Sequence, residues 1–257
     1  MQTWAKPQFA AEHQPIIEVF QSTIRVAARR RMANVGVSQS DGRHGGGTGQ
    51  DVLARLSIDI RSLPQAARHA AEWPGVLEAI GSIPRANFCP PEVAPRAADD
   101  IPLPIGFGQT ISQPLIVAVM TGLLQPTSSK RILEIGTGSG YQAAVLSRLV
   151  NHIDTVEIIP ELAAGARRAI DALGIGNVAV HVGDGRAGWP AGAPYDGIIV
   201  TACATQLPQA LLSQLGEGGR LVIPVGRRDQ RLKLLVRHSD GRIDDHDILA
   251  VRFVPFV

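Results

Sequence analysis

The sequence predicts an α/β fold, a doubly wound and mostly parallel β-sheet with helices on both faces. Short apolar, β-branched runs of strand length recur after residue 130. Helical stretches separate most of these runs, and that alternation is typical of a parallel sheet. A glycine-rich loop follows the first run, at the place where such sheets bind ligands.

The predicted strands are short and follow one another closely. They are RILEI (131–135), TVEII (155–159), VAVHV (178–182), YDGIIVTA (195–202) and RLVIPV (220–225). The helical stretches between them are 141–150, 160–173 and 206–215. The chain ends in two extended runs around an Asp-Gly turn at 240–241, which predicts an antiparallel hairpin at the edge of the sheet.

Helices are also expected before the first strand. Short helical patterns around Pro64 and Pro74 predict small packing helices, and SQPLIVAVMTGLLQ (112–125) predicts a longer one. Ser112 is its expected N-cap, because Pro114 then falls in the first turn, where a missing N–H costs nothing.

Composition excludes several classes of protein. The chain has 257 residues, 45% of them hydrophobic, and no run reaches the roughly 18 apolar residues of a membrane span. Its two cysteines, Cys89 and Cys203, lie far apart and lack metal-ligand spacing. We therefore expect both to be small buried hydrophobes, with no disulfide framework, no metal site and no membrane association, in the reducing cytoplasm.

Charge is distributed unevenly along the chain. Residues 1–50 hold 6 basic and 3 acidic residues, and residues 51–257 hold 19 and 20. A nearly neutral body argues against nucleic-acid binding, which draws on clustered Lys and Arg. The basic tract RRDQRLK (227–233) is an exception, and a solvated turn with an edge strand explains it better. Because 34–50 is rich in Gly and Ser, we predict a flexible extension over 1–50 and one folded domain over 51–257.

The glycine-rich loop reads EIGTGSGY (134–141). Glycines at alternate positions allow backbone conformations and a close ligand approach that side chains would block. The third glycine of a dinucleotide fingerprint would fall on Tyr141, where helix packing needs a small residue, so NAD and FAD are disfavoured. No Gly-Lys-Ser/Thr follows, which excludes a P-loop.

The pattern E-x-G-x-G-x-G instead resembles motif I of the class I S-adenosylmethionine-dependent methyltransferases. Glu157 lies 21 residues after Gly136, at the end of the second strand, where a carboxylate takes ribose hydroxyls. Asp184 ends the third strand and is placed to meet the adenine amino group. Either carboxylate alone would more often be a solvated surface charge, but suitable residues after three successive strands favour a cofactor site.

Two classes of methyl acceptor lack their signatures. Methylation of amino groups commonly uses an N/D-P-P-Y/F loop after the fourth strand, where this chain has TACATQLP (201–208). Methylation of base carbons needs a nucleophilic Cys, commonly after Pro, whereas Cys89 follows Phe88 and Cys203 follows Ala202.

Seven segments, in order and covering about 74 to the end, resemble the protein-L-isoaspartate O-methyltransferase family. They are IPRANFCP (83–90), PLPIGFGQTISQP (102–114), RILEIGTGSGYQAAVLSRL (131–149), HVGDGRAGWP (181–190), APYDGIIVTA (193–202), GGRLVIPVG (218–226) and VRFVPFV (251–257). PIGFGQTISQP and VRFVP are peculiar to that family. The chain departs from it before Asp99, where PRAAD stands in place of a common Tyr, at the expected active-site lid.

The resemblance implies a seven-stranded class I sheet and an enzyme that methylates the free α-carboxylate of L-isoaspartyl residues. The ester closes to a succinimide, whose hydrolysis returns part of the damage to aspartate. A carboxylate with a pKa near 3.5 is ionised at pH 7, so the nucleophile needs no general base. In-line transfer becomes a problem of positioning.

The resemblance also implies roles for individual residues. Ser112 would orient the acceptor carboxylate with its hydroxyl, with modest effect, and this role is compatible with helix capping. The peptide groove, expected to bind backbone in extended form along edge strands of the hairpin, would involve Thr110, Ile111, Gln113 and Val254 within the terminal segment 251–255. S-adenosylmethionine contacts would come from Glu134, Gly136, Thr137, Gly138, Ser139, Gly140, Glu157, Asp184, Gly185 and Thr201.

Two other functions stay open from the sequence. One is a methyltransferase for a different carboxylate, and the other is a non-catalytic binding module on the same fold. The intact glycine loop and its two carboxylates argue against the module. We expect isoaspartyl-containing proteins and peptides as partners, and a monomer.

Overall fold

The computed structural model describes residues 51–53, 56 and 59–256. The extension and linker expected over 1–50 lie outside these residues. By its internal contacts the chain divides into two units. One comprises 1–45 with Gly106–Gly108, and the other, 46–105 with 109–257, contains the main sheet and the site.

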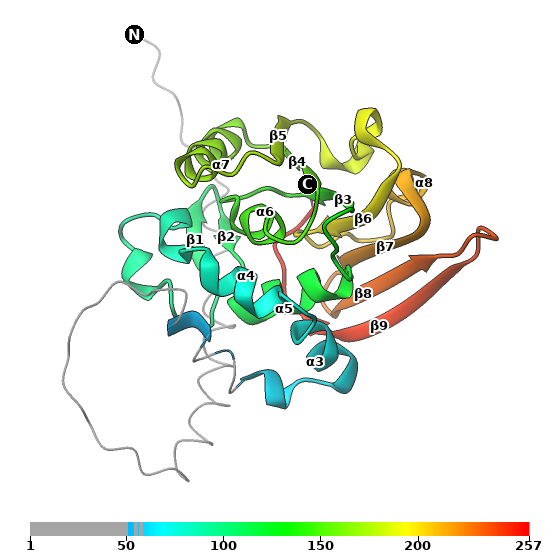
Figure 1. Ribbon diagram of the computed structural model, residues 1–257, viewed down its shortest axis with the longest axis horizontal. Helices are drawn as coiled ribbons and strands as arrows, with labels where there is room; N and C mark the ends of the chain where they lie inside the picture. The colour runs from blue at the N-terminus through cyan, green and yellow to red at the C-terminus, as the bar shows by residue number, and fades with distance from the viewer. Residues whose placement is uncertain (1–50, 54–55, 57–58, 257) are drawn as a thin grey trace. The chain divides into compact units, whose positions relative to one another are not determined.

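The main sheet of the described residues has seven strands in the order β5-β4-β3-β6-β7-β8-β9 (Figure 1). Its strands are β3 (Arg131–Ile135), β4 (His152–Glu157), β5 (Val178–Val182), β6 (Tyr195–Val200), β7 (Leu215–Val225), β8 (Gln230–Arg237) and β9 (Ile243–Val251). The first five pair in parallel, and β8 and β9 pair antiparallel. The predicted fold class is confirmed, including its antiparallel C-terminal hairpin.

Among the described residues, the remaining elements are helices and one small hairpin. The α-helices are α3 (Gln65–Ala71), α4 (Val76–Ser82), α5 (Pro114–Leu123), α6 (Tyr141–Leu146), α7 (Pro160–Ala172) and α8 (Gln209–Gln214). Short 3-10 turns are η2 (Ile60–Ser62), η3 (Arg85–Phe88), η4 (Ala94–Arg96), η5 (Gly185–Ala187) and η6 (Pro190–Gly192). Strands β1 (Leu103–Gly106) and β2 (Gln109–Ile111) form a separate two-stranded sheet.

Two apolar cores lie on the two faces of the main sheet. Ile132 belongs to the larger core, with buried residues of α3 to α7, and Leu133 belongs to the smaller, with Leu211 of α8. Neighbouring residues separate in this way because successive side chains of a strand point to opposite faces. The helices are therefore layered on both sides of the parallel strands.

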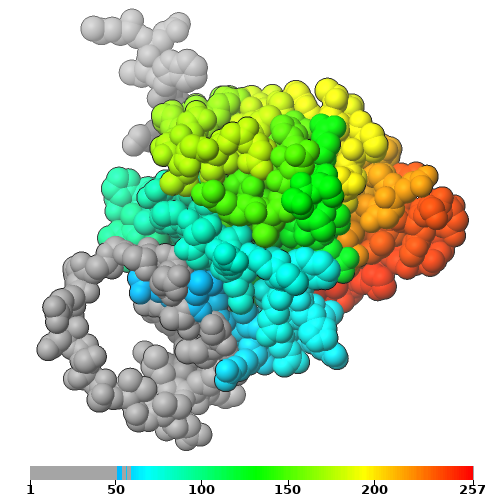
Figure 2. All heavy atoms as spheres, in the orientation of Figure 1, coloured from blue at the N-terminus to red at the C-terminus, as the bar shows by residue number. Residues whose placement is uncertain are grey.

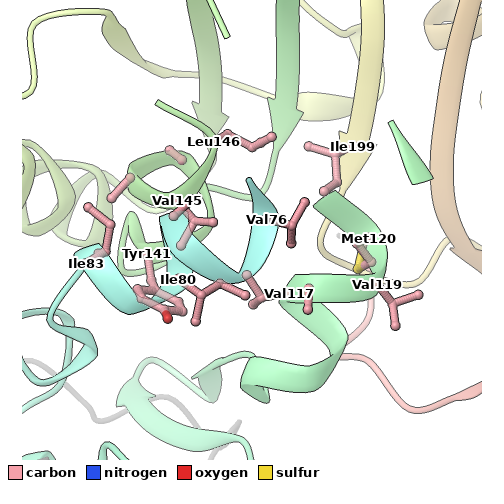
Figure 3. Packing of buried hydrophobic residues seen from close by; sticks show 14 of the residues in the cluster. Val76, Ile80, Ile83, Val117, Val119, Met120, Tyr141, Val145, Leu146 and Ile199 are labelled. Atoms are coloured by element: carbon pink, nitrogen blue, oxygen red, sulfur yellow. The ribbon is translucent and has the colours of Figure 1, made fainter. Parts of the chain in front are cut away.

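The packing of α4 against α5 is part of the larger core. Figure 3 shows Val76 and Ile80 of α4 facing Val117 and Met120 of α5, with the Tyr141 ring alongside. Helix α3 also packs against α5. The two helices approach each other at Gly122, where an added Cβ would overlap the backbone carbonyl of Ala70. Close packing of this kind anchors α5, whose first turn adjoins the candidate site.

A polar network around Asp154 of β4 includes the first residues of β3, β4 and β6 and the penultimate residue of β5. Asp154, which is 5% exposed, lies 2.8 Å from His181 Nε2 and accepts a hydrogen bond from the Tyr195 hydroxyl at 3.1 Å. His152 and Arg131 lie 3.5 and 3.7 Å from the same carboxylate. Burial raises the pKa of Asp154, but the hydrogen bond from His181 and the other partners together hold that pKa below its usual range.

The C-terminal hairpin corrects the interpretation of the basic tract at 227–233. Strand β8, which contains the end of that tract, lies between β7 and β9, so β9 is the edge strand. Lys233 lies 3.0 Å from Asp245 and 2.8 Å from Asp247 of β9. The basic residues therefore face an acidic partner strand, which the sequence analysis did not pair with them. In Figure 2 the orange to red atoms of these strands form one flank of the described part of the molecule.

Candidate active site

A pocket lies at the carboxyl ends of β3, β4 and β6. Its walls come from Gln109–Ser112, Ile135–Ser139, Val156–Ile159, the pair Thr201 and Ala202, and Val254–Phe256. Ligands of doubly wound sheets bind at this edge. The pocket therefore joins the predicted cofactor loop, the predicted acceptor segment and the end of the described chain.

The glycine loop is held in a conformation that favours glycine. Gly136 has φ +91°, and an added Cβ would overlap the Thr201 hydroxyl. That hydroxyl donates hydrogen bonds to the carbonyls of Gly136, at 2.5 Å, and Ile135, at 3.1 Å. The Gly136 amide donates to the Val156 carbonyl at 2.8 Å. The loop thus approaches its neighbours too closely for any side chain at this position.

Gly140 has a different role from the other two glycines of the loop. It does not line the pocket, and it precedes α6 with φ +88°. A Cβ here would lie 3.1 Å from the Ala166 side chain of α7. Gly140 therefore permits close packing of α6 against α7.

Glu157 ends β4 and faces the pocket. It is 5% exposed, and its Oε2 accepts from the Gly138 amide at 2.8 Å while Oε1 accepts from the Ile159 amide at 3.0 Å. Each carboxylate oxygen can accept a second hydrogen bond. The side chain is thereby fixed in one orientation and retains acceptor capacity toward the pocket.

Glu134 lies behind the loop rather than in the pocket wall. It is fully buried, and its Oε2 accepts from the Thr155 hydroxyl at 2.5 Å. That hydroxyl lies 2.7 Å from the hydroxyl of Thr137, which does line the pocket. Burial raises the pKa of Glu134 to about 8, against the lowering effect of the Thr155 hydrogen bond. Glu134 therefore reaches the pocket only through two threonines.

The two predicted cofactor residues after β5, Asp184 and Gly185, differ in their position relative to the pocket. Gly185 lines the pocket, but Asp184 does not. The Asp184 side chain is 43% exposed and accepts hydrogen bonds from the Arg186 guanidinium at 2.7 and 3.0 Å. Those bonds lower the pKa of Asp184.

On the acceptor side, Thr110, Ile111 and Ser112 line the pocket. Gln113 does not, because its side-chain amide donates to the Asp100 carboxylate at 2.8 Å. The expectation that Ser112 caps α5 was wrong. Gln113 occupies the N-cap position without a side-chain cap bond. The Asp100 carboxylate instead accepts a hydrogen bond from the Leu115 amide at 2.8 Å. An N–H of the first turn, which has no partner within the helix, is therefore satisfied by a residue 15 positions earlier in the chain.

The segment after β9 forms the remaining wall. The Val254 carbonyl accepts from the Cys203 amide at 2.8 Å, and the Phe256 amide donates back to the Cys203 carbonyl at 2.9 Å. Gln230 of β8 anchors this segment by bonding both the amide and the carbonyl of Phe253, at 2.6 and 3.2 Å. The segment beyond the hairpin thus reaches the pocket. Binding of a peptide along the hairpin's edge strands stays a prediction.

Sequence reasoning missed several residues of the site. Tyr141 and Gln142 line the pocket directly after the glycine loop, and the Gln142 amide donates to the Thr121 hydroxyl at 2.9 Å. Their place at the start of a helix that follows the loop was the available signal. Cys203 is buried as expected, whereas Cys89 is only half-buried, and both are free thiols.

Two classes of feature are absent from the described residues. Within the described part of the chain, no cluster of His, Cys, Asp and Glu is suited to holding a metal ion. No helix among those same residues combines the length and apolar character needed to cross a bilayer.

Comparison with known proteins decides the family. The family model described as protein-L-isoaspartate(D-aspartate) O-methyltransferase (PCMT) matches residues 64–257. The chain belongs to this family. The resemblance stated from the sequence motifs is therefore confirmed, and the match covers both the sheet and the whole lining of the pocket.

Curated relatives and solved structures agree with this family. A protein-L-isoaspartate O-methyltransferase of Anaeromyxobacter dehalogenans (strain 2CP-C) is 50% identical over 74% of this chain and 96% of its own length. That of Vibrio cholerae serotype O1 is 54% identical over 72% and 88%. A solved protein-L-isoaspartate O-methyltransferase, 28% identical, has a TM-score of 0.68 and covers 81% of this chain and 65% of its own. A Plasmodium falciparum PCMT structure in complex with S-adenosyl-L-homocysteine, 21% identical, supports the fold with a TM-score of 0.67 over 82% and 99% of the two chains.

Proposed function

We propose that this chain transfers a methyl group from S-adenosylmethionine to the free α-carboxylate of L-isoaspartyl residues in damaged proteins and peptides. The ester then closes to a succinimide, and hydrolysis of the succinimide restores part of the damage to normal aspartate. One observation carries this proposal. A single pocket brings the glycine loop and Glu157 together with Thr110–Ser112 and Val254–Phe256, which belong to the segments PLPIGFGQTISQP and VRFVPFV that resemble the family.

The residues present fit the cofactor. The loop at Gly136 and Gly138 presents bare backbone to the pocket, and Glu157 faces it with fixed acceptor oxygens suited to a ribose diol. When bound, S-adenosylmethionine supplies an electrophilic methyl group on a sulfonium. We propose that Thr137, Ser139, Gly185 and Thr201 complete the wall around it, with Glu134 acting through Thr137.

Asp184 carries the least direct support of the proposed cofactor residues. Its carboxylate is paired with Arg186 and lies outside the pocket lining. The adenine contact proposed for it therefore requires either a free lone pair beside Arg186 or a rotation of the Asp184 side chain.

The acceptor carboxylate attacks the methyl carbon as the carbon–sulfur bond breaks, and the bonding electrons pass to sulfur. No proton moves in this step, since the acceptor is ionised at neutral pH. The chain's contribution is alignment and exclusion of water. We propose that Ser112, which lines the pocket, donates its hydroxyl to one acceptor oxygen and leaves the other free to react. The isoaspartyl backbone would lie along Thr110, Ile111 and Val254, with Gln113 behind them.

The proposal extends to the molecular context. We propose a cytoplasmic monomer, with a methyltransferase domain over 51–257 that does not need residues 1–50. The near balance of 19 basic and 20 acidic residues in that domain supports a catalyst that meets many unrelated proteins and no nucleic acid. Sedimentation of the full chain tests the monomer, and activity of a 51–257 fragment beside the full chain tests the domain limits.

The deciding experiment compares an isoaspartyl peptide with its normal aspartyl twin, using methyl-labelled S-adenosylmethionine. Base-labile methyl ester on the isoaspartyl peptide alone is expected. Equal labelling of both peptides would favour a methyltransferase for other carboxylates. Calorimetric binding of S-adenosylmethionine with no labelling of either peptide would favour the non-catalytic module.

A further inference from the structure

Arg85 is a buried cation outside the main sheet. It belongs to η3, and only 1% of its surface is exposed. Its Nη1 donates to the carbonyls of Ala97 and Asp99, at 2.9 and 3.1 Å. Its Nη2 donates to the carbonyls of Ile101 and Ser112, at 2.8 and 2.9 Å. One planar guanidinium thus joins four carbonyls from two parts of the chain.

Asp100 holds the residues that follow Ser112. It lies on the same connection as three of the carbonyls bound by Arg85, and its two carboxylate oxygens accept from the Leu115 amide and the Gln113 side chain, both at 2.8 Å. Arg85 therefore holds the carbonyl of Ser112, and Asp100 holds the residues that follow it. We call this pair the Arg85–Asp100 clamp.

The clamp acts where regular structure ends. Strand β2 ends at Ile111 and helix α5 begins at Pro114, so Ser112 lies in the link between two elements. Proline has no N–H and fixes its own φ, which stiffens the link on one side. The guanidinium also restrains the Ser112 backbone directly, and the Asp100 carboxylate restrains it through Gln113 and Leu115.

The opposite wall of the pocket has separate restraints. The Thr201 hydroxyl and the Val156 carbonyl hold Gly136, and the Gly138 amide bonds Glu157. These bonds connect the carboxyl ends of β3, β4 and β6 and do not involve the clamp. A change in the clamp should consequently move the acceptor side of the pocket and leave the cofactor side in place.

We propose that Arg85 and Asp100 are positioning residues that hold the pocket wall at Thr110–Ser112, and with it the acceptor carboxylate, in line for methyl transfer. The inference rests on the proposed function and adds to it two residues that do not line the pocket. A displacement of about 1 Å remote from the reacting atoms can cost about 100-fold in rate. Loss of the clamp should therefore lower turnover and acceptor affinity while the affinity for cofactor stays the same.

The test uses Arg85→Met, Arg85→Lys and Asp100→Asn in the full chain. Arg61→Met and Glu92→Gln are the controls, because both residues are exposed and lie outside the clamp and the pocket. For each variant, kcat and KM are measured with an isoaspartyl peptide, and the Kd of S-adenosylhomocysteine is measured by calorimetry. A preserved Kd also reports that the variant has folded.

We expect Arg85→Met to lower kcat/KM by about 100-fold, with a fall in kcat as well as a rise in KM. Asp100→Asn should lower kcat/KM less, because its amide oxygen can still accept from the Leu115 amide. The Kd of S-adenosylhomocysteine should remain within about threefold of wild type. Arg85→Lys should retain part of the activity, since an ammonium group keeps the charge and three donors but not the planar fork. Both controls should match wild type.

Three results would overturn the inference. Variants of the clamp as active as the controls would show that the position of Thr110–Ser112 does not depend on it. A parallel loss of cofactor affinity and activity would show support of the whole fold rather than positioning. Equal activity of Arg85→Met and Arg85→Lys would contradict a role for donors at this place. An inactive wild type would instead refute the proposed function, and the positioning role with it.

Discussion

Gly136→Ala is the substitution for which the structure gives the most direct expectation. The residue has φ +91°, and its Cβ would overlap the Thr201 hydroxyl that ties β6 to the loop after β3. Gly174 provides a matched control, because it has φ +64° but no atom within 4 Å of its Cβ position. The pair separates backbone strain from the steric contact.

The magnitude follows from two contributions. Alanine in a left-handed conformation costs about 1–2 kcal/mol of unfolding free energy. Displacing the Thr201 hydroxyl sacrifices its bonds to the carbonyls of Ile135 and Gly136, worth about 1 kcal/mol in net terms. Gly136→Ala should therefore cost about 2–3 kcal/mol, against about 1–2 kcal/mol for Gly174→Ala. In a domain of this size each kcal/mol lowers Tm by about 2–4 °C.

Thermal unfolding and calorimetry with S-adenosylhomocysteine measure the two effects. Gly136→Ala should melt about 4–12 °C below wild type and bind the ligand at least about tenfold more weakly, while Gly174→Ala should bind normally. The reasoning is refuted if both variants melt together and Gly136→Ala keeps wild-type affinity. That result would mean that the loop relaxes around a side chain without consequence.

Three further predictions concern single side chains. Glu134 ionises less readily in the folded chain, with a pKa of about 8, than when unfolded, so its contribution to stability is present at low pH and is lost as pH rises toward 8. In urea unfolding, the stability of Glu134→Gln relative to wild type should rise between about pH 5 and 8 and stay level above that range. A difference in unfolding free energy that does not change with pH would contradict the raised pKa. Ser112→Ala should lower kcat by about tenfold or less, because one hydrogen bond orients the acceptor and no proton is transferred; a loss of kcat beyond about 1,000-fold, measured with an isoaspartyl peptide, would indicate a chemical role. Gln230→Ala removes both bonds to Phe253 and should raise KM for that peptide more than it lowers kcat; unchanged KM would show that the terminal wall holds its position unaided.

The sheet could be predicted where burial makes the local pattern simple. The run at 131–135 coincides with β3, because a strand inside a parallel sheet forms a short apolar segment. The run at 178–182 coincides with β5, an edge strand, whose valines carry a strand preference of their own.

The sequence predicts a start at 220 for strand β7, because GEGG (216–219) carries no strand signal of its own. In the structure, β7 starts at Leu215. Leu215 pairs with Tyr195 of β6, and the register shifts before Arg220 pairs with Gly197, so 216–219 form an irregular part of the strand.

The same distinction applies to the site. The glycine loop and Glu157 could be found because their spacing in the sequence reflects one strand-helix-strand unit. Arg85, Asp100 and Gln230 were missed. Their partners lie 12 to 27 residues away, and an isolated polar residue has no period from which a fold can be inferred. Asp184 forms an ion pair with Arg186, two residues later in the chain, and the spacing of the carboxylates does not predict that pair.

The polar network around Asp154 has a consequence for how this enzyme tolerates change. Arg131, His152 and Tyr195 are the first residues of their strands, whereas the pocket lies beyond the last residues of those strands. These three residues thus lie at the amino ends of the strands, and the pocket lies at the carboxyl ends. A site with a buried carboxyl and glycines in constrained conformations is a source of instability, and enzymes commonly trade stability for activity at such places. Because the residues of this network lie outside the pocket lining, stabilising substitutions near Asp154 can compensate for destabilising ones in the pocket without touching a reacting group.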